Sequence, residues 1–144
     1  MNIDVEYGRA SAEAFIPADH PLFADHFPGS PLLPGSLMIE LAAQVSGPVA
    51  EEFARMRMEI ERWAVLGMVR DVRFLQPVFL PASLWIHASV FRSEPSRIET
   101  YVVISDNGER VMQGTIVMMM IETSAELAPA IEARHNRLAR WKAL

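Results

Sequence analysis

Residues 23–47, with the sequence FADHFPGSPLLPGSLMIELAAQVSG, decide how this chain folds. As far as Pro34 the stretch carries three prolines, a glycine and one histidine, a composition typical of a constrained loop. From Gly35 onward it predicts a helix, in which Glu40 and Gln44 are the only polar residues across positions 37–45. Residues four positions apart share one helix face. A helix that is apolar on its other sides is normally buried in a core.

His26 in the loop and Glu40 in the helix form a candidate acid–base pair. A neutral imidazole titrates near working pH and can accept a proton. A carboxylate inside an apolar helix costs free energy unless it has a partner. We therefore expect Glu40 to be buried among Leu37, Ile39 and Leu41, which would favour its protonated form and suit proton donation.

The loop and helix resemble the signature of the (3R)-hydroxyacyl-acyl-carrier-protein dehydratases of the FabZ/FabA type. That signature runs H-F-P-G-x-P-x-x-P-G-x-L-x-x-E/D-x-x-x-Q, with histidine and acid separated by fourteen positions, as they are here. Weaker similarity continues through residues 67–78 (GMVRDVRFLQPV), and the spacing before the histidine is closer to a shorter branch resembling the dehydratases of aryl-polyene pathways. The matching positions of the main motif are His26, Phe27, Pro28, Gly29, Pro31, Pro34, Gly35, Leu37, Glu40 and Gln44.

The resemblance implies dehydration of a (3R)-3-hydroxyacyl thioester on acyl carrier protein to the trans-2-enoyl form. His26 would be the base, and Glu40 the acid or the group that orients water. Gly35 would stabilise the enolate oxygen through its backbone N–H, since it opens a helix at the positive end of the dipole. Gln44 would support Glu40 or the loop. The plainer alternatives stay open: a loop histidine held by backbone groups, a carboxylate that only secures a strand, and a turn glycine.

Composition limits the other functions that the chain could have. The 144 residues fit one domain, 1–144, and 51% of them are hydrophobic. The net charge of −5 argues against nonspecific nucleic-acid binding. Without cysteine there is no disulfide or thiolate metal site, no metal-ligand spacing is present, and a cytoplasmic protein is expected. No apolar run approaches the roughly 18 residues of a membrane span.

After the helix, Gly47-Pro48 predicts a kink or restart, followed by an exposed helix over 51–62. The period then shifts towards two, which predicts strands near 65–75, 83–92, 98–105 and 110–122, the last two joined by a hairpin at 106–108 (DNG). Before the motif we expect a weak strand within 1–10 and a short one over 12–17. From about residue 124 an amphipathic helix is predicted, because Leu127, Ile131, His135, Leu138 and Trp141 recur at helical spacing.

One long apolar helix followed by antiparallel strands predicts an α+β fold. The resemblance makes this the hot-dog fold, in which an antiparallel sheet wraps around a long central helix, here with an added C-terminal helix. It also implies a homodimer, with a trimer of dimers as a larger option, that accepts acyl carrier protein. No cofactor of its own is expected, because the substrate is held by the 4'-phosphopantetheine of the carrier. Three rivals are an acyl thioesterase of the same fold, a non-catalytic acyl-carrier-binding partner subunit, and an oligomeric scaffold with neither binding nor turnover.

Two further groups of residues have functional and plain interpretations. Met38 and Met68 are candidate walls of an acyl tunnel, although methionines such as 118–120 are more often ordinary core. Several arginines are candidate contacts for an acidic carrier or its phosphate, although a solvated face is the plainer reading for each: Arg55, Arg57, Arg62, Arg70 and Arg73.

Overall fold

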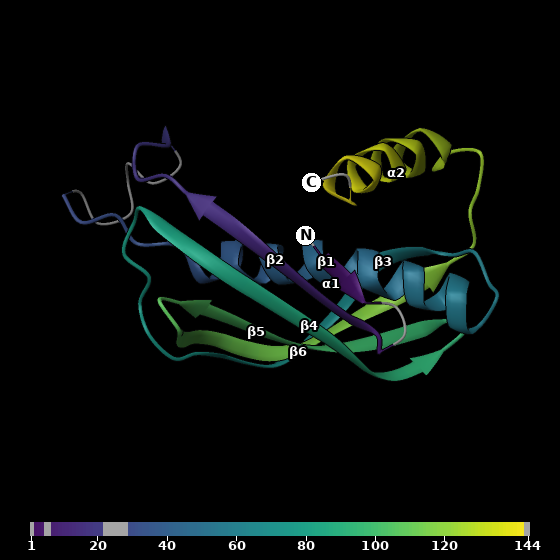
Figure 1. Ribbon diagram of the computed structural model, residues 1–144, viewed down its shortest axis with the longest axis horizontal. Helices are drawn as coiled ribbons and strands as arrows, with labels where there is room; N and C mark the ends of the chain where they lie inside the picture. The colour runs from purple at the N-terminus through teal and green to yellow at the C-terminus, as the bar shows by residue number, and fades with distance from the viewer. Residues whose placement is uncertain (1, 5–6, 22–28, 143–144) are drawn as a thin grey trace.

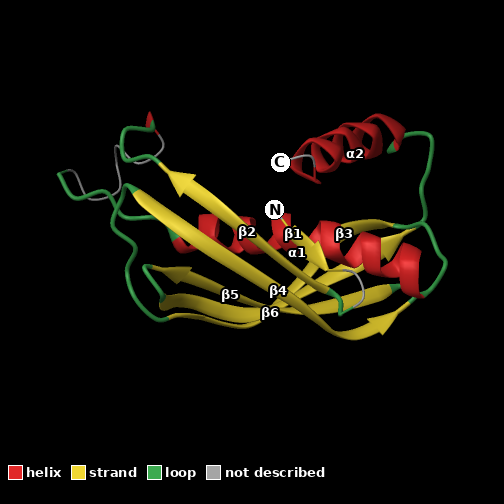
Figure 2. Cartoon of the chain, in the orientation of Figure 1, coloured by secondary structure: helices red, strands yellow, loops and turns green. Residues whose placement is uncertain are grey.

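A computed structural model describes residues 2–4, 7–21 and 29–142 of the chain, with backbone alone for 135 and 137–142. An antiparallel sheet curves around one long helix, α1 (Gly35–Arg57), and a second helix, α2 (Ala128–Lys142), lies beyond it (Figures 1 and 2). The six strands lie in the order β1-β2-β4-β5-β6-β3. This arrangement confirms the predicted α+β hot-dog fold. The strands are β1 (Asn2–Asp4), β2 (Arg9–Ile16), β3 (Trp63–Phe74), β4 (Ala82–Glu94), β5 (Arg97–Asp106) and β6 (Glu109–Ile121).

The last four strands begin and end within two residues of the predicted positions. Alternate residues of each strand face α1, and those facing residues form the core, as Ile86, Ile104 and Met112 do. The predicted hairpin joins β5 to β6, with φ values of 50° at Asn107 and 81° at Gly108. Positive φ at both central residues is the geometry of a type I′ turn, whose twist matches that of the strands.

The amino-terminal prediction is confirmed in outline. The weak strand corresponds to β1, and the strand predicted over 12–17 begins earlier, at Arg9 in β2. β2 pairs antiparallel with β4 from Arg9↔Ser89 to Ile16↔Ala82. The first three residues of β2, which the prediction over 12–17 did not include, join the sheet by pairing with β4, far away in sequence.

Two predictions about the helix are wrong: the restart at Gly47-Pro48, which was the alternative to a kink, and the extension of the helix to residue 62. α1 runs unbroken from Gly35 through Pro48 to Arg57, so the helix does not restart, and it ends before Arg62. Its middle is fully buried, and the Thr100 hydroxyl of β5 donates to Ser46 Oγ at 2.8 Å. Packing of this kind supplies most of the stability of a helix within a protein, so it can offset the donor lost at a proline. The segment after Pro48 is also less exposed than predicted, since Ala54 has no exposed surface.

α2 is held against the C-terminal half of α1, on the far side from β5 and β6 (Figure 1). Arg134 pairs with Glu51 of α1, and its guanidinium lies 4.2 Å from the ring centroid of Trp63. Of the predicted apolar stripe, Leu127 and Ile131 are half-buried, whereas the side chains of the other three members lie outside the described residues. None of the helices in the described ranges combines the length and the apolar character needed to span a membrane.

Candidate active site

The start of α1 is fixed by a short segment of antiparallel pairing between the loop before it and the chain after β3. The Leu33 N–H donates to the Val78 carbonyl at 2.9 Å, and the Leu80 N–H donates to the Pro31 carbonyl at 3.0 Å. Leu33 and Val78 are both buried. The proline-rich half of the motif thus serves to place the first turn of the helix against the end of the sheet.

The first turn of α1 presents backbone N–H groups that the helix does not use. The Pro34 carbonyl accepts from Leu37 at 3.0 Å and from Met38 at 3.3 Å, whereas Gly35 and Ser36 precede the first acceptor within the helix. Pro34 occupies the N-cap position and gives no side-chain cap, and the first turn contains no acidic residue. These N–H groups, at the positive end of the helix dipole, are suited to a negatively charged oxygen.

A groove of about 410 Å³ opens beside this turn. Of the two candidate tunnel walls, Met38 is almost fully buried and lines the groove, whereas Met68 is 50% exposed and does not line it. The volume falls within the range of small-molecule sites, and the walls are mainly apolar. They are formed by Leu33, Gly35, Met38, Phe74, Leu75 and the Gln76–Pro77 segment.

Glu40 and Gln44 share one helix face, as predicted, and Gln44 Nε2 donates to Glu40 Oε1 at 2.8 Å. The expected burial of Glu40 is wrong for this chain, because both side chains are exposed. The sheet covers the opposite side of α1, where Met38, Ala42 and Val45 are buried. At 100° per residue, Glu40 lies about 140° around the helix from Gly35, so the two face different directions.

His26 lies outside the described residues, as do Phe27 and Pro28 of the motif. Gly29, the next residue, is exposed with φ of 86°, a conformation that glycine adopts at little cost. This agrees with a role for Gly29 in shaping the loop. Of the other histidines, His20 and His87 are exposed, and His87 stacks on Trp85 with ring centroids 6.4 Å apart.

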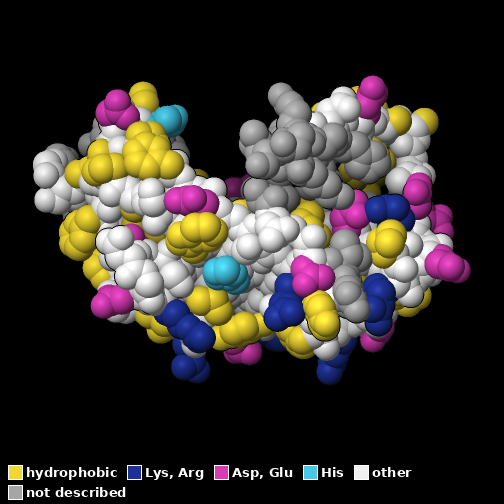
Figure 3. Space-filling model, in the orientation of Figure 1, with side chains coloured by type: hydrophobic (Ala, Val, Ile, Leu, Met, Phe, Trp, Pro, Cys, Tyr) yellow, Lys and Arg dark blue, Asp and Glu magenta, His cyan; other side chains and the backbone are white. Residues whose placement is uncertain are grey.

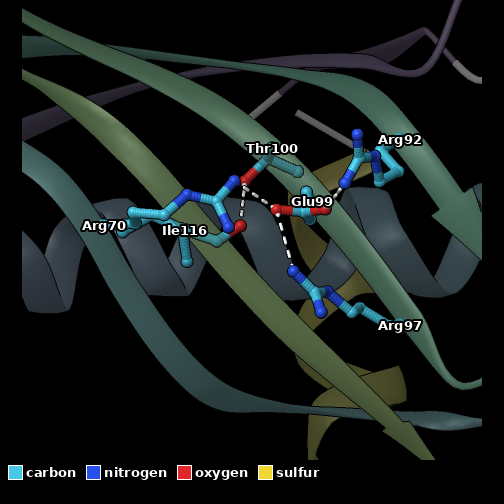
Figure 4. Close-up of polar contacts among 6 residues, drawn as sticks. All are labelled: Arg70, Arg92, Arg97, Glu99, Thr100 and Ile116. Atoms are coloured by element: carbon cyan, nitrogen blue, oxygen red, sulfur yellow. Dashed lines mark hydrogen bonds and ion pairs between the residues drawn. The ribbon is translucent and has the colours of Figure 1, made fainter.

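A cluster of charged side chains lies on the outer face of the sheet, towards the end where α1 finishes (Figure 4). Glu99 of β5 is completely buried there, pairs with Arg70 and lies 3.3 Å from Arg97 and 3.5 Å from Arg92. Burial alone would raise the pKa of this carboxyl, but the contacts from Arg70 and Arg97 outweigh it and hold the pKa below its ordinary value of 4.5. Because all three arginines converge on the buried Glu99 and none of these residues lines the groove, we interpret the cluster as structural. Arg70 is thus engaged with Glu99, and no sequence pattern had indicated that pair.

Hydrophobic side chains gather on the surface at the end of the molecule where β2 finishes (Figure 3). Phe15 is 67% exposed and Phe79 is 61% exposed, and the register places both near the start of β4. Phe74 and Leu75, at the groove, are 49% and 45% exposed. Exposed apolar clusters of this kind often mark surfaces that contact another molecule.

Of the residues that line the groove, the sequence had singled out Gly35 and Met38 but had assigned no role to Phe74. The available signals were its place in the similarity over residues 67–78 and an aromatic residue at the end of a strand, next to a proline-containing turn.

Within the described ranges, no three acidic or histidine side chains come close enough to hold a metal ion.

The model of the FabA-like domain family matches residues 2–121, from β1 to the end of β6. Among curated proteins, the 3-hydroxyacyl-[acyl-carrier-protein] dehydratase FabZ of Myxococcus xanthus is 27% identical over 120 residues, which cover 83% of this chain and 78% of the relative. The protein of the same name from Acetivibrio thermocellus is 29% identical over 126 residues, covering 85% and 82%.

Solved structures support the fold. The dehydratase heterocomplex ApeI:P from Xenorhabdus doucetiae superposes with a TM-score of 0.66 at 19% identity, over 91% of this chain and 85% of that one. A hypothetical thioesterase from Streptococcus pneumoniae, solved with coenzyme A, superposes with a TM-score of 0.63 at 16% identity, over 83% of each chain. At such identities the likeness concerns the arrangement of helix and sheet.

Proposed function

The chain belongs to the FabA-like family, whose model spans residues 2–121, and on that premise we propose that it is a hydro-lyase acting on (3R)-3-hydroxyacyl thioesters of acyl carrier protein. The reaction would yield the trans-2-enoyl thioester and water. The observation that carries the proposal is the first turn of α1, where N–H groups without a helical acceptor open beside an apolar groove within the dehydratase motif. The names of the curated relatives support the same chemistry.

In the proposed mechanism, His26 removes the proton from the carbon next to the thioester carbonyl. The charge that develops on the carbonyl oxygen is stabilised by the Gly35 N–H at the helix terminus. The bond between the third carbon and its hydroxyl then breaks, and Glu40 donates the proton with which the hydroxyl leaves as water. Gln44 holds the Glu40 side chain in place through the 2.8 Å hydrogen bond.

We further propose that the site is completed by a second copy of the chain. Glu40 is exposed and turned about 140° around α1 from Gly35, so it faces away from the groove of its own subunit. A homodimer would bring the Glu40 of one subunit towards the groove and His26 of the other. The exposed apolar cluster at that end of the molecule supports contact with another chain, and a trimer of dimers would contain the same shared sites.

The proposed partner is acyl carrier protein, which would present the acyl chain on its 4'-phosphopantetheine arm. No cofactor of the enzyme's own takes part in this reaction. Arg73, exposed beside the groove residue Phe74, is a candidate contact for an acidic carrier. We propose a cytoplasmic setting, in which the carrier would be encountered.

The proposal is tested with purified protein and 3-hydroxyacyl carrier protein, by following the absorbance of the conjugated enoyl thioester. We expect turnover by the natural sequence and a loss of about 10²- to 10⁴-fold in His26→Ala and in Glu40→Gln, the usual contribution of an acid or base. Unaltered melting temperatures would show that both variants fold. Full activity in either variant would refute its assigned role, and release of free thiol in place of enoyl product would indicate a thioesterase.

A further inference from the structure

The ring of Phe74 occupies the space that a side chain at Gly35 would need. A Cβ placed on Gly35 would lie 2.8 Å from Cζ, 3.0 Å from Cε1 and 3.1 Å from Cε2 of that ring. In a helix the Cα–Cβ bond tilts towards the N-terminus. The ring therefore flanks the N–H groups of the first turn and forms the wall of the groove nearest to them.

A β-bulge in β3 turns Phe74 towards the helix. The register runs from Arg70↔Thr115 to Arg73↔Gln113, so three steps along β3 match two along β6. The extra residue reverses the alternation, and Phe74, which would otherwise point outward with Arg70, pairs with Met112 on the core side. Asp71 within the bulge has φ of 53°.

The same bulge fits closely over a glycine in β6. A Cβ on Gly114 would lie 2.8 Å from the Cα of Val72, so the bulged backbone occupies the space that a side chain would fill. On the other side of Phe74, the Leu75 N–H donates to the Val111 carbonyl at 2.8 Å. The backbone is thus fixed on both sides of Phe74, and the position of the ring is set by the sheet and not by a free loop.

We infer that Phe74 selects acyl thioesters that carry no branch on the carbon next to the thioester carbonyl. This inference rests on the proposed function, in which the carbonyl oxygen is bound by the N–H groups of the first turn. With the oxygen there, the adjacent carbon lies against the ring, and a methyl branch on it competes with the ring for the same space. One methyl group in a fitted apolar pocket changes specificity by about 10- to 200-fold.

The length of the acyl chain should depend on other residues. Met38 lines the groove one turn further along α1, and its unbranched, flexible side chain adapts to different contents. The ring of Phe74 lies beside Gly35, at the start of α1. Shortening Phe74 is therefore expected to change selectivity for branching and to leave the preference for chain length largely unchanged.

The test compares kcat/KM for 3-hydroxybutyryl and 2-methyl-3-hydroxybutyryl carrier protein, both with the (3R) configuration at the hydroxyl carbon. The natural sequence should prefer the unbranched substrate by about 10-fold or more. Phe74→Ala should reduce that preference by about 10-fold, with Phe74→Leu intermediate because it keeps apolar cover over Gly35. Phe91→Ala is the matched control, since Phe91 of β4 is 53% exposed and does not line the groove, and it should keep the natural preference.

Three results would overturn the inference while leaving the proposed function intact: equal use of both substrates by the natural sequence, an unchanged preference in both Phe74 variants, or the same change in Phe91→Ala. If the natural sequence forms enoyl product from neither the unbranched nor the branched substrate, the proposed function is refuted, and the inference with it. Melting temperatures of all variants separate a change in selectivity from a failure to fold.

Discussion

Two inactive variants should restore activity when they share a dimer. Glu40 faces away from the groove that contains Gly35 of the same chain. If His26 of one subunit acts with Glu40 of the other, a dimer of one His26→Ala chain and one Glu40→Gln chain contains one intact site and one doubly altered site. Random assembly of equal amounts makes half of the dimers mixed, so the mixture should recover about one quarter of the natural activity.

The experiment unfolds the two variants in urea, mixes them in equal amounts, and refolds them before the enoyl assay. A second mixture, of the natural chain with a doubly altered His26→Ala, Glu40→Gln chain, serves as the matched control. A site shared between subunits predicts about one quarter of the natural activity here too, because mixed dimers contain no intact site and only the dimers of two natural chains are active. A site formed within one chain predicts almost no activity in the first mixture and about one half in the second, and that pair of results would show that the site is not shared between subunits.

Three further predictions concern the framework. Replacing Gly114 by Ala should lower the free energy of unfolding in urea by about 1–3 kcal/mol, because the new Cβ meets the Val72 backbone at 2.8 Å; an unchanged midpoint would contradict the bulge geometry. The lowered pKa of Glu99 means that its stabilisation is present above the ordinary pKa of 4.5 and is lost as pH falls through the folded-state pKa. The natural chain should therefore lose stability more steeply below about pH 4.5 than Glu99→Gln does. If the free energies of unfolding of the two chains, measured by chemical denaturation, fall in parallel with pH, the arginine contacts of Glu99 do not stabilise the fold. Arg134→Ala removes the pair with Glu51 and should speed proteolytic removal of α2 while β1 to β6 stay protected, whereas equal cleavage rates would show that other contacts hold the helix.

Local patterns in the sequence were sufficient to predict most of the fold. The helix begins at Gly35, where the prolines stop, and the turn at Asn107 and Gly108 has the positive φ values that these residue types favour. The strands that follow alternate with period two because one face of the sheet packs on α1. Each of these features depends on residues close together in the chain, so the sequence contains the relevant information.

The features that were missed depend on contacts between distant residues. Pro48 continues the helix because the sheet packs around it, and Glu40 is exposed because the sheet covers only the other side of α1. The bulge that aims Phe74 depends on an absent side chain at Gly114, on a neighbouring strand. Glu99 looks like an ordinary strand residue until three arginines from three strands converge on it.

In the proposed function, the N-terminal turn of α1 and the motif residues remove water from a carrier-bound hydroxyacyl group. Mass spectrometry of intact 3-hydroxyacyl carrier protein after incubation with the chain tests it most directly. We expect a product lighter by one water, formed by the natural sequence and not by His26→Ala. A carrier that has lost its whole acyl group, or one that binds the protein and returns with its mass unchanged at every chain length, would contradict it.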